Sequence, residues 1–462
     1  MIRRIARDGV FLRTLAAIAL PIALQNLIAS GLNMVDTIMI GQLGDTRIAA
    51  VGLANQITFL LHLFLFGISS GSAIFTAQYW GIRDQVNIRR ILGLGLVTSL
   101  VISSVFALGG LLGPSLLLGL FSSDPAVLDQ GSRYLVIVAW SYPMMAVSFT
   151  YAGVLRSTGD ARLPMYISAF ALLLNTGLNY LLINGRAGFP ALGVSGAAWA
   201  TLTARSVEIC AMLLVVYWRR GVLAARPAEL CDWTGAYIRR FFRTASPVIL
   251  NESLWAVGVT MYVIVYARMG TDVVASINIA ATAERLALVV FFGIASAAGI
   301  MLGNLIGAGD PDLAFRYAKR FAVLGPLFGL LAGALLILAS PWVVSFYKVS
   351  PAAAAAARGI LLVYGLVAPF RVFNIINIVG ILRSGGDTRF ALFLDTAGVW
   401  LIAVPLAFLG GLVWGLPVQQ VVMLIVIEEG FKVTLGLRRL LSRRWINRLV
   451  GEPARQIAAD AE

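Results

Sequence analysis

The segment TLAAIALPIALQNLIASGLNMVDTIMI, residues 14–40, decides the class of fold. It contains a single charged residue, Asp36, and it exceeds the roughly 20 apolar residues that cross a ~30 Å hydrocarbon core as a helix. Comparable runs recur along the 462 residues, of which 59% are hydrophobic and 13% are charged. A soluble domain carries about 25% charged residues. The sequence therefore predicts an all-α integral membrane protein.

Twelve apolar runs have the length of membrane-spanning helices. Because these runs are continuous and do not alternate with polar residues, helices are favoured over a β-barrel. The predicted spans are residues 14–40, 48–76, 92–120, 131–155, 164–185, 194–218, 244–268, 274–303, 318–346, 358–382, 388–410 and 416–437. The first run is long, contains Pro21 and several polar residues, and lacks a convincing cleavage site. We interpret it as a retained helix and not as a signal peptide.

Lys and Arg residues are distributed unevenly between the two sides of the predicted bundle. Segments on the side of the termini hold 26 of the 36, segments on the opposite side hold six, and four lie within spans. Positive charge accumulates in cytoplasmic segments. The distribution predicts a multi-pass protein of the cell inner membrane with both termini in the cytoplasm. It also relates the net charge of +14 to membrane lipids, so nucleic acid is not an expected partner.

The two halves of the sequence match each other at a nearly constant offset of 226 or 227 residues. The matched positions include Pro21 with Pro247, Gly67 with Gly293, Gly81 with Gly307, and Leu155-Arg156-Ser157 with Leu382-Arg383-Ser384. Each half has six spans, so both halves insert in the same orientation. We expect two pseudo-symmetric six-helix bundles with a cavity between them, an arrangement that suits transport by alternating access.

This repeat divides the chain into four predicted parts. They are an N-terminal six-helix lobe at 1–218, a basic cytoplasmic linker at 219–243, a C-terminal six-helix lobe at 244–437, and a basic cytoplasmic tail at 438–462. Pro21 and Pro247 lie inside the first helix of each lobe, where a proline removes a backbone hydrogen bond and kinks the helix. The kinks can be static, or the two helices can bend during a transport cycle.

Asp36 is the first candidate functional residue, because an ionisable side chain at mid-membrane costs roughly 2.5–3.5 kcal/mol on insertion scales. Gln25 precedes it by about three helical turns and lies on the same face. Asn33 flanks that face. A polar stripe on a membrane helix faces protein or water, so we place Gln25 and Asn33 among the substrate-binding candidates.

Amides and a hydroxyl in later spans can complete a site around Asp36. Asn175 and Asn179 are four residues apart and share a helix face, and Thr201 lies in the next span. A desolvated carboxylate in such a setting can hold a proton near neutral pH, and with several neutral oxygens it can instead bind Na⁺. The alternative is a carboxylate that the amides satisfy for packing reasons alone.

The second half has its own acidic residues. Glu252 follows the kink at Pro247 by about one turn, and Trp255 lies three residues further on, so a carboxylate and an aromatic face could bind a lipophilic cation. Asp395 lies two turns into the eleventh span and could line the same cavity or serve the structure. Arg371 is a candidate counter-charge for a buried carboxylate. Arg205 with Glu208, and Glu428 with Lys432, are spaced to pair along one helix.

Two cytoplasmic loops of similar sequence, Arg156 to Asp160 and Arg383 to Asp387, follow the fourth span of each half. Glycine allows a tight turn there, and the Arg and Asp of each loop could pair across it. No phosphate-binding GxxxxGK[ST] or HExxH motif occurs, so neither ATP hydrolysis nor another enzyme activity is expected. His62 has no suitably spaced partner for a metal, and we expect no cofactor.

The ordered set of these segments resembles the MATE (multidrug and toxic compound extrusion) family of ion-coupled antiporters, from about residue 10 to 437. The segments are Pro21-Ile-Ala-Leu-Gln25-Asn26, Val35-Asp36-Thr37, Gly41-Gln-Leu-Gly44, Arg156 to Asp160, Leu178-Asn179-Tyr180, Leu192 to Gly196, Gly303 to Asp310, and Arg383 to Thr388. The resemblance implies a V-shaped twelve-helix exporter of amphipathic, often cationic drugs, driven by inward H⁺ or Na⁺.

The resemblance also assigns site residues. It implies an N-terminal ion site made of the helix 1 aspartate Asp36, with Asn175 and Thr201, while Asn179 stands where some members have an aspartate. This departure removes one charge from a Na⁺ site. Glu252 matches the acid that the family has in the C-terminal lobe.

The sequence thus predicts a monomeric H⁺- or Na⁺-coupled multidrug antiporter that needs no cofactor and exports amphipathic cations. A flippase for lipid-linked oligosaccharides, of the same superfamily, is the main alternative, although a pyrophosphate-binding cavity would need more basic residues than acidic ones. A membrane-embedded enzyme or a channel is a further alternative, and the duplicated six-helix halves argue against a channel.

Overall fold

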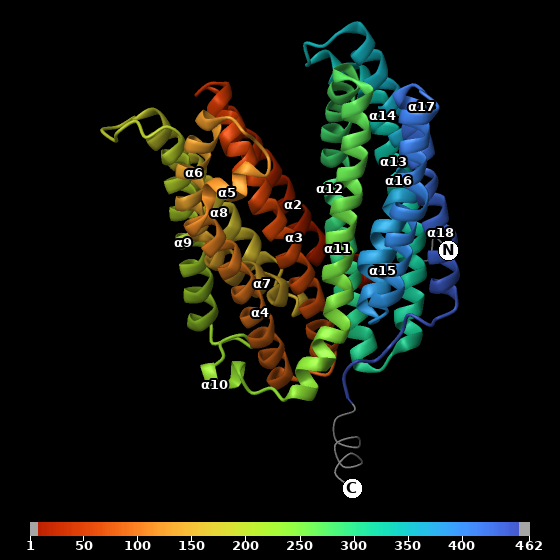
Figure 1. Ribbon diagram of the computed structural model, residues 1–462. Helices are drawn as coiled ribbons and strands as arrows, with labels where there is room; N and C mark the ends of the chain where they lie inside the picture. Colours follow the sequence, from red (N-terminus) through yellow and green to blue (C-terminus); the bar gives the residue numbers. More distant parts are fainter. Residues whose placement is uncertain (1–7, 452–462) are drawn as a thin grey trace. The chain divides into compact units, whose positions relative to one another are not determined.

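The computed structural model describes residues 8–451, which form helices and connecting loops without a strand (Figure 1). Arg3, Arg4 and Arg7, and the predicted tail beyond residue 451, lie outside the described residues. The helices of the first half are α2 (Gly9–Gly41), α3 (Asp45–Gly81), α4 (Gln85–Leu112), α5 (Pro114–Gly119), α6 (Pro125–Ala139), α7 (Ser141–Ser157), α8 (Arg162–Asn184), α9 (Val194–Trp218) and α10 (Pro227–Leu230). Those of the second half are α11 (Gly235–Met269), α12 (Thr271–Ala308), α13 (Pro311–Ser345), α14 (Pro351–Ile375) with the π-helix η1 (Ile376–Leu382), α15 (Thr388–Ala397), η2 (Gly398–Ala403), α16 (Val404–Phe408), η3 (Leu409–Val413), α17 (Val418–Ile425) and α18 (Ile427–Leu441).

Ten helical segments of the described chain are long and apolar enough to cross a membrane, and the bent pair α6 and α7 makes an eleventh. The predicted twelfth span corresponds to α17 and α18, which meet at Val426. Its inner part carries Glu428, Glu429 and Lys432, so it is more charged than the other spans. The all-helical membrane fold is confirmed.

Two predicted spans differ from the structure because of proline and glycine. The third was expected over 92–120, but α4 ends at Leu112 and a separate α5 starts at Pro114, since Gly113 and Pro114 interrupt the helix. The fourth divides into α6 and α7, which are bent by 49° at Trp140. Pro143 has no N–H to donate to the carbonyl of Ala139, so the bend falls one turn before the proline.

The described chain forms two compact units. One comprises the chain up to Ala23, Ala77–Arg83 and the chain from Leu250 onward, and the other comprises Leu24–Thr76 and Asp84–Ile249. Each unit has its own apolar core. The core of the second unit includes Tyr142 and Leu135, and that of the first includes Ile360 and Val421. The boundaries proposed for the two lobes, at 218 and 244, remain predictions.

Small residues explain why the end of α3 belongs to the first unit, because they let it pack directly on α12. A Cβ atom on Gly81 would lie 2.1 Å from the carbonyl oxygen of Asn304, and one on Gly307 would lie 1.9 Å from that of Gln78. Gly81 and Gly307 are repeat partners at an offset of 226. The two helices therefore cross backbone to backbone, through the kind of small-residue spacing that allows close approach of membrane helices.

Close glycine contacts also join the first helix of one half to the second helix of the other half. In the first unit, a Cβ on Gly293 of α12 would lie 2.9 Å from the carbonyl oxygen of Ala19 on α2. In the second unit, a Cβ on its repeat partner Gly67 of α3 would lie 2.8 Å from the Cα of Ile249 on α11. The duplicated glycines thus make equivalent contacts within each unit.

The helices α2 and α11 each pass from one unit to the other inside the helix, after Ala23 and after Ile249. Pro21 and Pro247 lie two residues before these points. The missing backbone hydrogen bond therefore falls close to the place where each helix changes its packing partners.

The segment between the halves packs on the N-terminal end of α4. Arg89 donates to Glu229 of α10 at 2.7 Å, and a Cβ on Gly93 would lie 1.8 Å from the carbonyl oxygen of Leu230. The backbone N–H of Arg226 and the Arg89 guanidinium hold the pKa of Glu229 below its ordinary value. The contribution of this contact is thus present at neutral pH and is lost as the pH falls through that lowered pKa.

We predict that Gly307→Ala destabilises the protein by about 1–3 kcal/mol, because the added methyl group must displace the α3 backbone. The measurement is the thermal unfolding of the purified full-length protein in detergent. Gly31→Ala is the matched control, since a Cβ on Gly31 meets no atom within 4 Å. Equal unfolding temperatures for the two variants would contradict the close crossing.

Candidate functional site

The Asp36 carboxylate of α2 is surrounded by neutral donors from α8. Asn179 Nδ2 donates to Asp36 Oδ1 at 2.9 Å, and Thr176 Oγ1 donates to the same oxygen at 3.4 Å. In the amide orientation that satisfies both of its ends, Asn175 donates to Asp36 Oδ2 at 2.8 Å and accepts from the N–H of Thr201 at 3.2 Å. The structure thus brings together the four residues that the sequence singled out as an ion site.

Helix geometry explains this assembly. Asn175 and Asn179 are one turn apart on α8, and both are buried. Thr201 occupies the second turn of α9, which packs along α8, and its own hydroxyl donates to the Ala197 carbonyl at 2.9 Å. The sequence analysis did not single out Thr176, although it lies next to Asn175 and a hydroxyl close to two amides could have indicated it.

Asp36 differs from the other membrane-embedded acids in its partners. Among the described residues, no Lys or Arg forms an ion pair with it, and its side chain is half-buried. A carboxylate that only neutral groups stabilise can take up a proton when it is desolvated. Both amides present nitrogen to it, so Na⁺ binding would require the amides to turn and present oxygen.

Gln25 lies in a different polar network of the second unit. Arg156 donates to Gln25 Oε1 at 3.0 Å, and Gln25 Nε2 donates to Ser168 at 3.0 Å. Ser168 in turn donates to Glu208 at 2.8 Å, and Glu208 pairs with Arg205 at 2.7 Å. The predicted pair of Arg205 and Glu208 is therefore confirmed, while Gln25 is bound to Arg156 and Ser168. Asn33 is exposed on α2.

Glu252 repeats the Gln25 contact in the other half of the chain. Arg383 donates to Glu252 Oε1 at 2.7 Å, and the side chains of Arg383 and Glu252 are 3% and 14% exposed. Gln25 and Glu252 are offset by 227 residues, as are Arg156 and Arg383. The duplicated contact is therefore a neutral hydrogen bond in the first half and an ion pair in the second half.

These arginines correct the expectation that the Arg and Asp of each cytoplasmic loop pair with each other. Asp160 instead accepts from the Leu163 N–H at 3.1 Å, and Asp387 accepts from Arg439 at 2.6 and 3.1 Å. The aspartates accept from donors other than the arginine of their own loop, while the arginines point back into the helices, toward the polar residue at the kinked first helix of each half.

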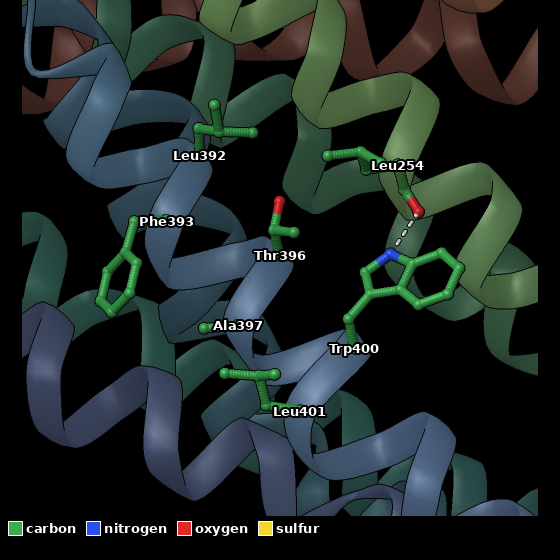
Figure 2. Close-up of a pocket in the computed structure, with 7 residues that line it drawn as sticks. All are labelled: Leu254, Leu392, Phe393, Thr396, Ala397, Trp400 and Leu401. Atoms are coloured by element: carbon green, nitrogen blue, oxygen red, sulfur yellow. Dashed lines mark hydrogen bonds between the residues drawn. The ribbon is translucent and has the colours of Figure 1, made fainter.

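The helix α11 also borders a pocket of about 310 Å³ (Figure 2). Figure 2 shows Leu254 of α11 facing Trp400, whose Nε1 donates to the Leu254 carbonyl at 3.1 Å. The pocket is lined by apolar side chains and Thr396. Trp255, which was expected to bind substrate, follows Leu254, and 41% of its surface is exposed.

Asp395 is held by a lysine that the sequence analysis did not connect with it. Lys432 Nζ lies 2.7 Å from Asp395 Oδ1 and 3.1 Å from Glu428 Oε2. Asn251 Nδ2 donates to Asp395 Oδ2 at 3.1 Å. The expected pair of Glu428 and Lys432 is confirmed, and Asp395 completes it from α15.

Arg371 is the counter-charge of buried carboxylates, as predicted. It pairs with Glu284 of α12 and, at 3.1 Å, with Glu429 of α18. Asn374, one turn further on α14, also donates to Glu429, at 2.7 Å. Glu284, for which the sequence offered no explanation, therefore belongs to this ion-pair cluster.

A multi-helix bundle with polar and ionic side chains buried between its spans is typical of multi-pass membrane transporters. The profile of the MatE family matches residues 21–181 and again residues 247–409. The chain belongs to this family, and the starts of the two matches are separated by the same 226 residues as Pro21 and Pro247.

Curated relatives cover nearly the whole chain. The chain is 32% identical over 424 residues to the multidrug resistance protein NorM of Burkholderia vietnamiensis, which covers 87% of this chain and 89% of the relative. It is 23% identical over 445 residues to the probable multidrug resistance protein NorM of Thermotoga maritima, covering 95% and 94%.

Solved structures share the fold. A crystal structure of a mutant of the Vibrio cholerae MATE transporter VcmN superimposes with a TM-score of 0.84 at 19% identity and covers 95% of this chain and 99% of that one. A MATE structure in complex with MaL6 gives a TM-score of 0.83, also at 19% identity, with coverage of 93% and 96%. The resemblance to the MATE family and its twelve-helix fold is therefore confirmed.

We predict that Arg383→Met destabilises the protein by about 3–5 kcal/mol, because it leaves the buried Glu252 without its cation. Combining it with Glu252→Gln should restore most of that loss, and Glu252→Gln alone should be tolerated, because it reproduces the Gln25 contact with Arg156. Thermal unfolding of the four proteins in a double-mutant cycle measures the coupling. Additive losses would contradict the assigned pair.

Proposed function

We propose that this protein is an ion-coupled multidrug antiporter that exports amphipathic cations by alternating access, with no covalent chemistry and no cofactor. The observation that carries the proposal is the Asp36 site, a carboxylate inside a membrane helix that has amide and hydroxyl partners and no paired cation among the described residues. Such a group can change its charge during a cycle without breaking an ion pair. The relatives named as multidrug resistance proteins support the substrate class.

The coupling ion favoured by the Asp36 geometry is H⁺. Asn179 and Asn175 both direct nitrogen at the carboxylate, which suits a group that alternates between a charged and a protonated form. Na⁺ remains the alternative, because a rotation of the two amides would present oxygen ligands.

The substrate cation is proposed to bind the acidic and aromatic residues Glu252, Trp255 and Asp395 of the first unit. Gln25 and Asn33 are proposed as polar substrate contacts within the second unit. Glu252 and Asp395 each hold a side-chain cation, Arg383 and Lys432. A drug cation would compete with these side chains for the carboxylates. If proton binding and drug binding favour different states of the bundle, the two fluxes are coupled.

The positive-inside distribution supports an orientation in the inner membrane with the termini, the linker and the loops that follow α7 and α14–η1 in the cytoplasm. The protein is proposed to act as a monomer. The flippase alternative needs a strongly basic cavity for a pyrophosphate. The ion-pair clusters of the second half instead contain five carboxylates, those of Glu252, Glu284, Asp395, Glu428 and Glu429, against three cations, Arg371, Arg383 and Lys432. This balance favours cationic substrates.

We predict that Asp36→Asn abolishes efflux of ethidium from proteoliposomes driven by a pH gradient, because the amide cannot take up a proton at neutral pH. Gradients of pH and of Na⁺ are imposed separately. Asp45→Asn, which alters an exposed acid at the start of α3, is the control and should transport normally. Unchanged pH-driven efflux in Asp36→Asn would remove Asp36 from the coupling mechanism.

Asn179→Asp provides a complementary prediction. A second carboxylate beside Asp36 supplies oxygen ligands and a further negative charge, so the variant should gain efflux driven by a Na⁺ gradient. The same proteoliposome assay measures this gain against the unmodified protein. If Na⁺ drives both proteins equally well, the Asn179 amide does not determine ion selectivity.

A further inference from the structure

A buried triad in the second half of the chain has one more negative charge than positive charge. Lys432 lies between Asp395 and Glu428, at 2.7 and 3.1 Å, and the three side chains are 6%, 15% and 9% exposed. A net charge inside a membrane bundle is costly, and proteins remove it by pairing or by protonation. One ammonium cannot neutralise two carboxylates.

The surrounding helices do not supply the missing positive charge. Glu429 of α18 and Glu284 of α12 already share Arg371, so this neighbouring cluster also has two carboxylates for one cation. Tyr262 of α11 lies within electrostatic range of Glu428, Glu429 and Asp395, and among the described residues its buried hydroxyl makes no hydrogen bond. Arg383, the residue that follows η1, is already paired with Glu252.

The backbone is shaped to hold the lysine in this position. A Cβ on Gly398 would lie 2.5 Å from Lys432 Cε and 3.3 Å from Glu428 Oε2. Gly398 is also the first residue of the π-helix η2, and π-helical turns within α-helices occur often at functional sites. The glycine therefore gives Lys432 room to reach across to Asp395.

A second observation points to a missing proton donor at the triad. Asn251 is 3% exposed and directs its amide at Asp395, to which Nδ2 donates at 3.1 Å. Its Oδ1 atom is buried and accepts no hydrogen bond. A buried acceptor without a donor is costly, and a protonated Asp395 would offer Asn251 the O–H donor that a carboxylate lacks.

Each residue of the triad has a repeat partner among the polar residues of the first half. At an offset of 227, Ser168 corresponds to Asp395, Thr201 to Glu428, and Arg205 to Lys432. Arg205 has one carboxylate partner, Glu208, so its pair is balanced. The second half carries acids at the two positions where the first half has hydroxyls.

We propose that Asp395, Glu428 and Lys432 form a second proton-binding site, in which the two carboxylates share one exchangeable proton. Lys432 fills the position that a metal cation would need, so the ligand is a proton and not Na⁺. This site is separate from Asp36. Its role in the transport cycle rests on the proposed function. In that cycle it adds one proton to the number exchanged per drug cation.

The test is pH-difference infrared spectroscopy of the full-length protein in lipid vesicles without Na⁺. The unmodified protein should show a carboxylic acid carbonyl band that disappears on alkalinisation. Glu428→Gln and Asp395→Asn should each change or remove this band, whereas Asp36→Asn and the balanced-pair control Glu208→Gln should retain it. Two variants of the triad are used because either one alone could fail to fold.

Several outcomes overturn the proposal. If Asp36→Asn removes all of the protonated-carboxyl signal, the triad holds no exchangeable proton. If Na⁺ added at constant pH removes the triad band, the site binds a metal cation. In proteoliposomes with ethidium as the probe, Glu428→Gln should move one proton fewer per ethidium than the unmodified protein. An unchanged ratio means that the triad takes no part in the transport cycle. If pH-driven efflux is lost only in Asp36→Asn, the proposed function still holds.

Discussion

The free-energy cost of a charge in a hydrocarbon surrounding governs the interior of this protein. Each carboxylate buried among the described spans has a partner, and the kind of partner separates Asp36 from the acids of the second half. Asp36 is stabilised by amides and a hydroxyl, which cost little to reorganise when the charge is lost. Glu252, Asp395 and Glu429 are stabilised by Arg383, Lys432 and Arg371, which must find other partners when the carboxylate is neutralised.

Gene duplication supplies the framework on which this difference developed. The contact of Gln25 with Arg156 and that of Glu252 with Arg383 are the same contact in two copies, a hydrogen bond to an amide in one and an ion pair with a carboxylate in the other. Likewise, the glycines of α3 and α12 make equivalent close approaches in each unit. A polypeptide that keeps its backbone contacts can thus vary the charge of its buried polar positions.

Local patterns were sufficient for the class of fold and for part of the Asp36 site. Apolar run length predicted the spans, and the four-residue spacing of Asn175 and Asn179 predicted a shared face. Helix ends were less predictable, since Gly113 and Pro114 divide one expected span and α11 begins at Gly235, within the stretch expected to be a linker. A membrane helix can continue beyond the hydrocarbon core into polar residues, and hydropathy alone does not detect that part of the helix.

By itself, the sequence determined the membrane location, the twofold repeat, the family and the residues able to carry charge in the bilayer, because length, apolarity and spacing act along a single helix. The tertiary structure decided which charges meet. Asp395 and Lys432 are 37 positions apart, and Arg371 reaches Glu284 across 87 positions. Such pairings depend on how helices cross, and crossings depend on small residues such as Gly398 and Gly307, whose effect appears only when a second helix is packed against them.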